Sequence, residues 1–351
     1  MRIPFRQILL FASGLLLSCQ LLAAQAGWQQ LSIPGSTPDA APVVVALYYP
    51  TKASARATPM GPFTVRAAIQ APPEDKFKGL IVLSHGIRGS ELGHSSLAEA
   101  LAQDGYLVAA IRHPGDNWQD HSLLQKGATA YFTERPRQVS HVIDVLLQDP
   151  QWKDRIASDA GGFRIGAMGH SAGGYTVLAL AGGQVDLSRI ETHCAAERAA
   201  DPIFCGVGRS SGSTASAPAA AASAASILPS LRDPRVRVAV LLAPMGVAFT
   251  ASSLAEIRIP LQIQEAQEDR FLVPRFHAEW IAQNVPAAEL HRTPNAWHFA
   301  FMDTPSIAIS TDDGDVRADP PGFDRPAFLA RLGNEVPAFF DKEFPESLPG
   351  R

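Results

Sequence analysis

A serine surrounded by glycines stands where an apolar segment passes into a helix-forming one. The sequence there is Gly169-His170-Ser171-Ala172-Gly173-Gly174, after the apolar run 163–168 and before residues 175–181. At such a strand-to-helix turn the serine takes a strained conformation that exposes its hydroxyl, and only glycine fits at the crowded flanking positions. The positive end of the following helix favours negative charge that develops beside it. The motif predicts a nucleophile at Ser171; a glycine-rich connection with a chance serine is the alternative.

A serine hydroxyl is a weak nucleophile near neutral pH, so it needs a base that takes its proton. That base is normally a histidine held by a carboxylate, and in this type of sheet the order along the chain is serine, acid, histidine. His298 follows the last predicted strand, in the segment Trp297-His298-Phe299. We therefore predict that His298 is the base; a packing histidine beside aromatic rings is the alternative.

The acid is expected after the preceding strand. The predicted strand 261–265 runs into three carboxylates, Glu265, Glu268 and Asp269. Asp269 lies farthest beyond the strand and before the helix that Pro274 opens, so loop position favours it as the acid. Glu268 remains the rival, and a solvated loop carboxylate is the alternative for each.

The oxyanion of a tetrahedral intermediate is best stabilised by backbone amides that are fixed in advance. Ala172, which follows the nucleophile, is predicted to supply one amide. Ile87 is predicted to supply the other, from the loop His85-Gly86-Ile87-Arg88-Gly89, in which Gly86 allows a tight turn. His85 precedes the serine in the chain, so we expect it to brace this loop rather than to act as the base.

Two further segments near the site are predicted to be structural. His170 is expected to point away from the serine into the supporting packing. The segment His113-Pro114-Gly115-Asp116-Asn117 follows another strand at the same edge of the sheet, where Asp116 and Asn117 are expected to stabilise a turn.

Short apolar strands alternate with helical segments along the chain. Strands are predicted at 28–33, 43–49, 80–84, 106–111, 163–168, 236–242, 261–265 and 289–292, the first two as an antiparallel pair. Helices are predicted at 95–103, ending at Gly105, and at 135–147, 175–181, 274–283 and 325–340. This order predicts an α/β fold with a mostly parallel central sheet of about eight strands and helices on both faces.

An insertion at about 183–234 interrupts this alternation. It contains Cys194 and Cys205, and then a stretch at 210–226 made almost wholly of serine, alanine, glycine and threonine. In an oxidising compartment the two cysteines are expected to form a disulfide; two buried free thiols are the alternative. The small side chains of 210–226 offer little to offset the entropy of ordering, which favours a flexible surface segment over a lid, although both remain open.

The N-terminus has the features of a cleavable signal peptide. Arg2 and Arg6 precede an apolar run at 8–22 and the small-residue site Ala24-Gln25-Ala26, so residues 1–26 are predicted to be removed on export to the periplasm or medium. The apolar run is short for a permanent membrane span, and Cys19 fits a lipid attachment site poorly.

The composition limits the classes of partner and cofactor. The 351 residues are 46% hydrophobic and 18% charged, enough for one large core in residues 27–351. Without Arg2 and Arg6, the remaining chain has 28 basic and 34 acidic residues, a net charge of −6. It has no stripe of basic residues that would indicate binding to nucleic acid.

The sequence does not predict a metal site. The acidic run Asp312-Asp313-Gly314-Asp315 lacks the glutamate of a calcium loop and is expected to be solvated surface. Only His193 lies beside the cysteines, so a zinc site is not expected, and the predicted chemistry needs no cofactor.

Together the motifs resemble the α/β-hydrolases grouped as predicted dienelactone hydrolases, which are akin to the platelet-activating-factor acetylhydrolases. The resemblance rests on Leu83-Ser84-His85-Gly86 and on the segments 113–117, 169–174 and 297–299, and it extends from about Val43 to Phe340. It implies the α/β-hydrolase fold and a serine carboxylic-ester hydrolase with Ser171, Asp269 and His298 as the triad and Ile87 and Ala172 as oxyanion donors. Dienelactone hydrolases proper use a cysteine nucleophile where this chain has Ser171.

The expected activity is hydrolysis of small-molecule esters with short to medium acyl groups, through an acyl-enzyme on Ser171. Shorter acyl groups are favoured because no long apolar lid helix is evident and aromatic residues are few. A peptidase or amidase with the same triad, and a non-catalytic cell-envelope binding protein on the same scaffold, are the alternatives.

Overall fold

Ten strands form the central sheet of the part of the chain that the computed structural model describes, residues 24–207 and 226–344. Six neighbouring strands run parallel, in the order β12 (Ala288–Thr293), β11 (Leu261–Ala266), β10 (Val236–Leu242), β9 (Ile165–His170), β5 (Leu80–Ser84) and β6 (Leu107–Arg112). Four more extend the sheet past β6, namely β2 (Val43–Thr51), β1 (Gln25–Ile33), β4 (Phe63–Ile69) and β3 (Arg56–Met60). The predicted mostly parallel sheet and the antiparallel β1–β2 pair are confirmed, with ten strands rather than about eight.

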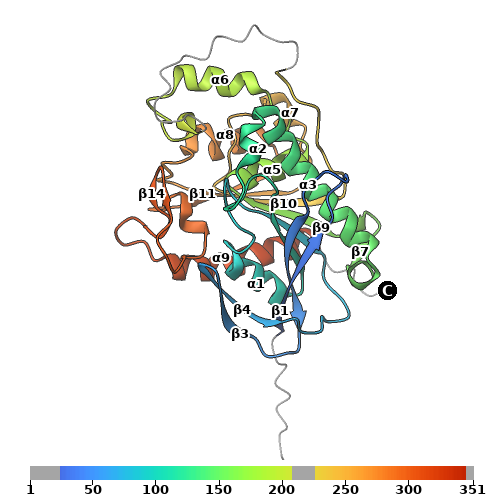
Figure 1. Cartoon of the computed structure of the whole chain (residues 1–351). Coiled ribbons are helices and arrows are strands. Elements are labelled where there is room, and N and C mark those ends of the chain that lie inside the picture. The colour runs from blue at the N-terminus through green and yellow to red at the C-terminus, as the bar shows by residue number, and fades with distance from the viewer. Residues whose placement is uncertain (1–23, 208–225, 345–351) are drawn as a thin grey trace, which may run out of the picture.

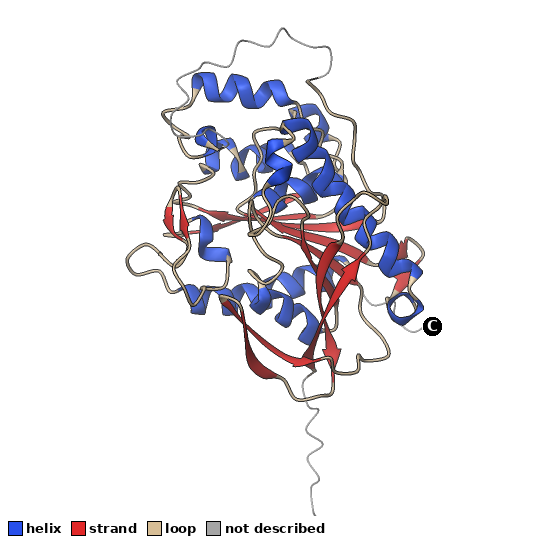
Figure 2. Ribbon diagram, in the orientation of Figure 1, coloured by secondary structure: helices blue, strands red, loops and turns tan. Residues whose placement is uncertain are grey.

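Helices cover both faces of this sheet, as predicted (Figures 1 and 2). One face carries α3 (Ala128–Gln148), α5 (Ala172–Ala181) and α8 (Ala278–Asn284), and the other carries α1 (Ser95–Asp104) and α9 (Arg325–Glu343). Parallel strands are apolar on both sides and need such cover, because each buried leucine or phenylalanine contributes about 1.5–3 kcal/mol. The core is accordingly split by the sheet into two clusters, one including Ile143 and Leu178, the other Leu101 and Phe340.

Smaller elements connect these layers. The short helices are α2 (Ser122–Gln125), α4 (Pro150–Lys153), α6 (Leu187–Ala196), α7 (Ala251–Ala255) and the 3₁₀ turns η1 (Phe204–Gly206), η2 (Pro274–Phe276) and η3 (His298–Phe301). Two small ladders pair β7 (Ser158–Asp159) with β8 (Gly162–Phe163) and β13 (Ser310–Thr311) with β14 (Gly314–Asp315).

Two predicted helix boundaries differ from those in the structure. The helix predicted at 135–147 begins earlier, at Ala128, and Pro136 lies inside it although proline suits the first turn better. The helix predicted at 274–283 is broken at His277 into η2 and α8. The end of α1 was predicted correctly, since Gly105 has a φ of 114° and stops the helix in the left-handed conformation.

Several predicted features lie wholly or partly outside the described residues. Cys19, most of the predicted signal peptide and most of the serine- and alanine-rich stretch are among them. Strand β1 begins at Gln25, two residues before the expected mature start at Gly27, and Ala26 is fully buried in it.

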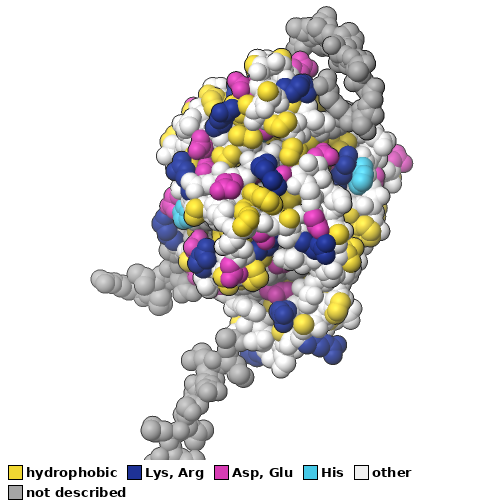
Figure 3. Space-filling view, turned by 90° about the vertical axis from the view of Figure 1, so that its left-hand side faces the viewer, with side chains coloured by type: hydrophobic (Ala, Val, Ile, Leu, Met, Phe, Trp, Pro, Cys, Tyr) yellow, Lys and Arg dark blue, Asp and Glu magenta, His cyan; other side chains and the backbone are white. Residues whose placement is uncertain are grey.

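Charged side chains of both signs are mixed on the face of the molecule that Figure 3 displays, together with apolar side chains. The acidic run near β14 is less solvated than expected. The Asp313 side chain is only 5% exposed and pairs with Arg270 at 2.8 Å, so the prediction of a solvated run is wrong for this residue.

Candidate active site

Ser171 lies in a strained turn between β9 and α5, with φ of 57° and ψ of −116°. Such a conformation costs roughly 1–3 kcal/mol for a residue with a side chain, so the surrounding structure must hold it. It is held by the next strand: the Ser171 amide donates to the Leu242 carbonyl at 2.9 Å, and the Met245 amide donates to the Ser171 carbonyl at 3.1 Å. The serine is thereby fixed at the carboxyl ends of two parallel strands.

The glycines around Ser171 are required by close backbone approaches. A Cβ on Gly169 would overlap the Gly173 carbonyl, and one on Gly173 would overlap the Ser84 carbonyl of β5. A Cβ on Gly174 would lie 2.6 Å from the Cβ of Pro244. The steric reason inferred from the motif therefore holds in the folded chain.

His298, at the start of η3, is hydrogen-bonded to Asp269, in the loop after β11. The distance from His298 Nδ1 to Asp269 Oδ2 is 2.7 Å, and both side chains are buried. A carboxylate only accepts hydrogen bonds, so Nδ1 carries a proton, and in the neutral imidazole the lone pair is then on Nε2. The ring is thus in the tautomer that a general base needs.

Backbone amides orient the Asp269 carboxylate. Its second oxygen, Oδ1, accepts from the amides of Phe271 and Leu272, both at 2.8 Å. The two rival carboxylates lie elsewhere: Glu268 is exposed, and Glu265 is buried with its Oε1 3.4 Å from Arg292 Nε. Of the three carboxylates at this strand end, Asp269 is the one bonded to His298.

Aromatic rings enclose His298. Phe271 stacks on it with ring centroids 4.9 Å apart and planes at 17°. On another side the His170 ring lies 4.8 Å away, and His170 Nε2 donates to the His298 carbonyl at 3.0 Å. Burial lowers the pKa of His170 well below its usual value, so this ring is a neutral support for His298. The expected packing role of His170 agrees with these contacts.

A cavity of about 230 Å³ opens at Ser171. Ile87 and Ala172, the predicted oxyanion donors, line it beside the serine, and so does Phe271, which links the cavity to His298. The rest of the lining is almost entirely apolar: Leu124, Gly127, Ala128, Tyr131, Phe132, Ile190, Phe204, Val207, Met245 and Leu272. The nucleophile candidate therefore faces a site suited to an apolar group.

The loop that carries Ile87 is fixed by hydrogen bonds. The Gly89 amide donates to the Gly86 carbonyl at 3.1 Å, and the Arg88 amide donates to Asp116 Oδ1 at 2.9 Å. The left-handed residue of the turn is Arg88, with φ of 54°. Gly86 gives room beside the serine, because a Cβ there would lie 3.2 Å from the Cβ of Ser171.

A buried arginine that the sequence analysis missed braces the same loop. Arg135 of α3 pairs with Asp116 and donates to the His85 carbonyl, and its Nη2 lies 3.1 Å from Ser84 Oγ. Its Nε also donates to Thr176 of α5 at 3.2 Å. Arg135 occupies the apolar face of the helix, spaced with Val139 and Val142, and that position was the available signal that it is buried.

His85 and His113 extend this network as neutral rings. His85 Nε2 accepts from the His113 amide at 3.2 Å, so the proton is on Nδ1, which donates to the Gly86 carbonyl at 2.6 Å. Burial and the Arg135 charge lower the pKa of His85 to about 4. Asn117 donates to the His113 carbonyl at 2.8 Å and closes the expected turn. His85 thus braces the loop, as the sequence order suggested.

The insertion contributes to the cavity wall. The predicted disulfide between Cys194 and Cys205 is confirmed, and it joins α6 to η1. Ile190, Phe204 and Val207 of this region line the cavity. The described part of the insertion is therefore next to Ser171, which the composition of 210–226 did not indicate.

The disulfide also bears on metal binding. Ligand atoms of His193 and the two cysteines lie within 4.8 Å of one another, but sulfurs joined in a disulfide are not the thiolates that zinc binds.

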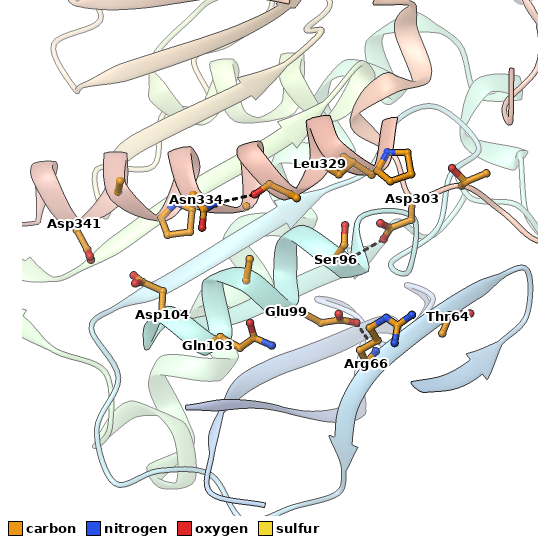
Figure 4. A pocket seen from close by; sticks show the side chains of 17 residues that line it. Thr64, Arg66, Ser96, Glu99, Gln103, Asp104, Asp303, Leu329, Asn334 and Asp341 are labelled. Atoms are coloured by element: carbon orange, nitrogen blue, oxygen red, sulfur yellow. Dashed lines mark hydrogen bonds between the residues drawn. The ribbon is translucent and has the colours of Figure 1, made fainter. Parts of the chain in front are cut away.

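A larger cavity, about 790 Å³, lies between α1, α9 and β4 on the other face of the sheet. Its carboxylates serve the fold (Figure 4): Asp303 accepts from the Ser96 amide at 2.9 Å, and Glu99 accepts from the Arg66 amide at 2.6 Å. At its far end Lys78 binds both Asp104 and Asp341. Histidine and cysteine are absent from the described residues that line it. The smaller cavity, which opens at Ser171, is therefore the candidate active site.

Comparison with known proteins agrees with the architecture. No family model matches the chain. Two cutinases of Thermobifida alba, est1 and est2, are each 31% identical over 119 residues, which make up 34% of this chain and 36% and 35% of the cutinases. The chain thus spans about a third of the length of these curated relatives.

Solved structures cover the chain more fully. A ferulic acid esterase from Streptomyces cinnamoneus matches with a TM-score of 0.59 and 19% identity, over 93% of this chain and 91% of that one. A dienelactone hydrolase from Anabaena variabilis gives a TM-score of 0.49 and 13% identity, over 90% of this chain and 98% of that one. The chain has the α/β-hydrolase fold, as the motifs implied. Among the described helices, none combines the length and apolar character needed to cross a bilayer.

Proposed function

We propose that the protein hydrolyses carboxylic esters of small molecules, with Ser171 as nucleophile, His298 as general base and Asp269 as the acid that orients His298. The hydrogen bond between His298 and Asp269, next to a cavity that opens at Ser171, carries this proposal. The partial similarity to two cutinases and the fold shared with a ferulic acid esterase support ester hydrolysis as the class of reaction.

The reaction follows from the roles of these side chains. His298 Nε2 takes the proton of Ser171 as the serine oxygen bonds to the acyl carbon. The amides of Ile87 and Ala172 stabilise the oxyanion, and loss of one such donor typically raises the barrier by about 3 kcal/mol. His298 then passes the proton to the departing alcohol as the C–O bond breaks, leaving the acyl group on Ser171. Water attacks this acyl-enzyme with the same base and releases the acid.

Covalent labelling tests the nucleophile directly. A fluorophosphonate probe is expected to modify the purified protein at Ser171, with the site read by peptide mass spectrometry. Ser171→Ala is expected to abolish labelling, and His298→Ala to slow it strongly. Unlabelled wild-type protein would exclude a serine hydrolase and favour the non-catalytic binding protein. Faster cleavage of aminoacyl anilides than of p-nitrophenyl esters would favour the peptidase.

We further propose that the enzyme is exported after removal of residues 1–26. The disulfide supports an oxidising compartment. The N-terminal sequence of the protein recovered from a periplasmic or culture-medium fraction is expected to begin near Gly27. Full-length protein confined to the cytoplasm would contradict this proposal.

A further inference from the structure

Part of the wall of the Ser171 cavity comes from a segment that a disulfide crosslinks. Ile190 of α6, Phe204 of η1 and the adjacent Val207 line the cavity. Cys194, which follows Ile190 in α6, forms a disulfide with Cys205, the residue after Phe204 in η1. We call residues 194–205 the disulfide loop. Phe204, which lines the cavity, is the residue immediately before the disulfide-bonded Cys205.

A buried carboxylate ties this loop to the body of the protein. Asp201 Oδ2 accepts from His193 Nε2 at 2.8 Å and from His277 Nε2 at 3.0 Å. The Asp201 side chain is fully buried, and its other oxygen has no hydrogen-bond partner among the described residues. Although burial disfavours the charge, the two histidines hold the pKa of Asp201 below its usual value. A buried carboxylate with two histidine donors is stable only while both hydrogen bonds are kept, so these bonds hold Asp201 in one position relative to His193 and His277.

His277 carries this attachment to the nucleophile. Its Nδ1 accepts from the Gly246 amide at 3.1 Å, so Nε2 bears the proton that binds Asp201. Gly246 follows Met245, which lines the cavity and whose amide donates to the Ser171 carbonyl. A Cβ on Gly246 would lie 2.5 Å from the His277 carbonyl, so this approach is close. Asp201 is thus connected to the serine turn through one histidine and two backbone residues.

The same histidines pack against the wall residue. The Phe204 ring lies 4.9 Å from the His277 ring at 68° and 5.9 Å from the His193 ring. Phe204 is therefore packed against both of the histidines that bind Asp201.

We propose that the disulfide loop, held by Asp201 against His277, limits the length of the acyl group that the cavity accepts, with Phe204 as the specificity-determining side chain and Asp201 as a positioning residue. This inference rests on the proposed ester hydrolysis. The cavity of about 230 Å³ is smaller than the roughly 300–1,000 Å³ of sites that enclose drug-sized ligands, which fits short to medium acyl chains.

The first test shortens the wall. Phe204→Ala is expected to raise the ratio of kcat/KM for p-nitrophenyl decanoate over butyrate at least about tenfold, since fit in an apolar pocket is worth that much per methylene. Phe323→Ala is the matched control, because Phe323 is also partly buried but packs against Phe328, away from this cavity. An unchanged ratio in folded Phe204→Ala would overturn the proposal, as would a change seen only when the alcohol part of the ester is lengthened.

The second test loosens the attachment without touching the wall. Asp201→Asn keeps the shape but removes the charge, and Cys194→Ser/Cys205→Ser removes the covalent link. Both variants are expected to raise KM for p-nitrophenyl hexanoate at least about fivefold, with kcat changed less than about twofold. Both should also reduce the dependence of kcat/KM on the length of the acyl chain, which we call the acyl-length profile. Glu197→Gln, an exposed charge in the same loop, is the control and should behave as wild type. An equal fall in kcat for all chain lengths would indicate a merely structural role and would contradict the proposal.

Different results would refute the proposed ester hydrolysis and the proposed role of the disulfide loop. Absence of fluorophosphonate labelling in the wild type would refute ester hydrolysis itself. Normal labelling with an unchanged acyl-length profile would refute the role of the disulfide loop alone. If Asp201→Asn does not fold, Phe204→Ala decides, because it leaves the disulfide and the Asp201 hydrogen bonds in place.

Discussion

Arg135 and Asp116 form an ion pair from which solvent is excluded, since neither side chain has any exposed surface. The pair joins α3 to the turn after β6, and through Asp116 Oδ1 and the His85 carbonyl it holds the loop that carries Ile87. A charge buried this deeply is stable only with its partner.

Substitution of Arg135 is expected to destabilise the folded protein strongly. Arg135→Met leaves the Asp116 carboxylate buried and unpaired, which should lower the free energy of unfolding by about 3–5 kcal/mol. Denaturant unfolding measures the loss. Arg137→Met, two residues along the same helix, removes a pair that is half exposed and should cost less than about 1 kcal/mol. Similar losses in the two variants would refute the bracing role of Arg135.

The close approach at Gly173 predicts a second large effect. Gly173→Ala would force a methyl group into the Ser84 carbonyl of β5, and overpacking of this kind should destabilise by at least about 2 kcal/mol and displace the serine turn. Gly206→Ala has open space around the new methyl group and should change stability by less than about 0.5 kcal/mol. Thermal and urea unfolding of both variants compare them, and tolerance of the alanine at 173 would contradict the geometry.

Kinetics decide between the two candidate acids. Asp269→Asn should lower kcat by roughly 10³–10⁴-fold, because an amide no longer holds His298 in the required tautomer. Glu268→Gln should leave kcat within about twofold, since Glu268 is exposed and Asp269 is the residue bonded to His298. The reverse ranking, measured on one p-nitrophenyl ester, would assign the acid to Glu268.

His94 predicts a specific sensitivity to acid. The ring is buried, and neither nitrogen has a hydrogen-bond partner among the described residues. Burial, with a smaller effect of His85, lowers the pKa of His94 from 6.5 to about 3. As pH falls below 6.5, the unfolded chain therefore binds a proton at His94 that the folded chain does not bind. This difference leaves the free energy of unfolding unchanged above pH 6.5 and lowers it progressively as the pH falls toward 3.

The variant His94→Phe tests this sign. It should match the wild type at pH 7.5 to within about 1 kcal/mol and be the more stable of the two at pH 5, with the pH slope smaller by about 1.4 kcal/mol per unit between pH 6 and 4. Urea unfolding across this range measures both slopes. Parallel pH dependences would mean that the folded protein accommodates a charged His94.

Local patterns in the sequence were sufficient for much of the scaffold. The strands Leu80–Ser84 and Val236–Leu242 were predicted to the residue, because a short apolar run between polar segments is typical of a strand covered on both faces. The β3–β4 hairpin was missed, since β4 alternates buried and exposed residues and β3 is largely exposed, so neither has such a run. Helix ends near Pro136 and His277 were wrong because tertiary packing, not propensity, decided them.

The sequence by itself was enough to predict the turn at Ser171 and to propose a serine, an acid and a base in that order along the chain. The turn is readable because it depends on backbone sterics among consecutive residues, which require the glycines at 169, 173 and 174. Only the tertiary structure distinguished Asp269 from Glu268, brought Arg135 to Asp116 and placed Phe204 at the cavity. These relationships join residues far apart in the chain, whose meeting depends on how whole strands and helices pack and on which side chain a loop then turns inward.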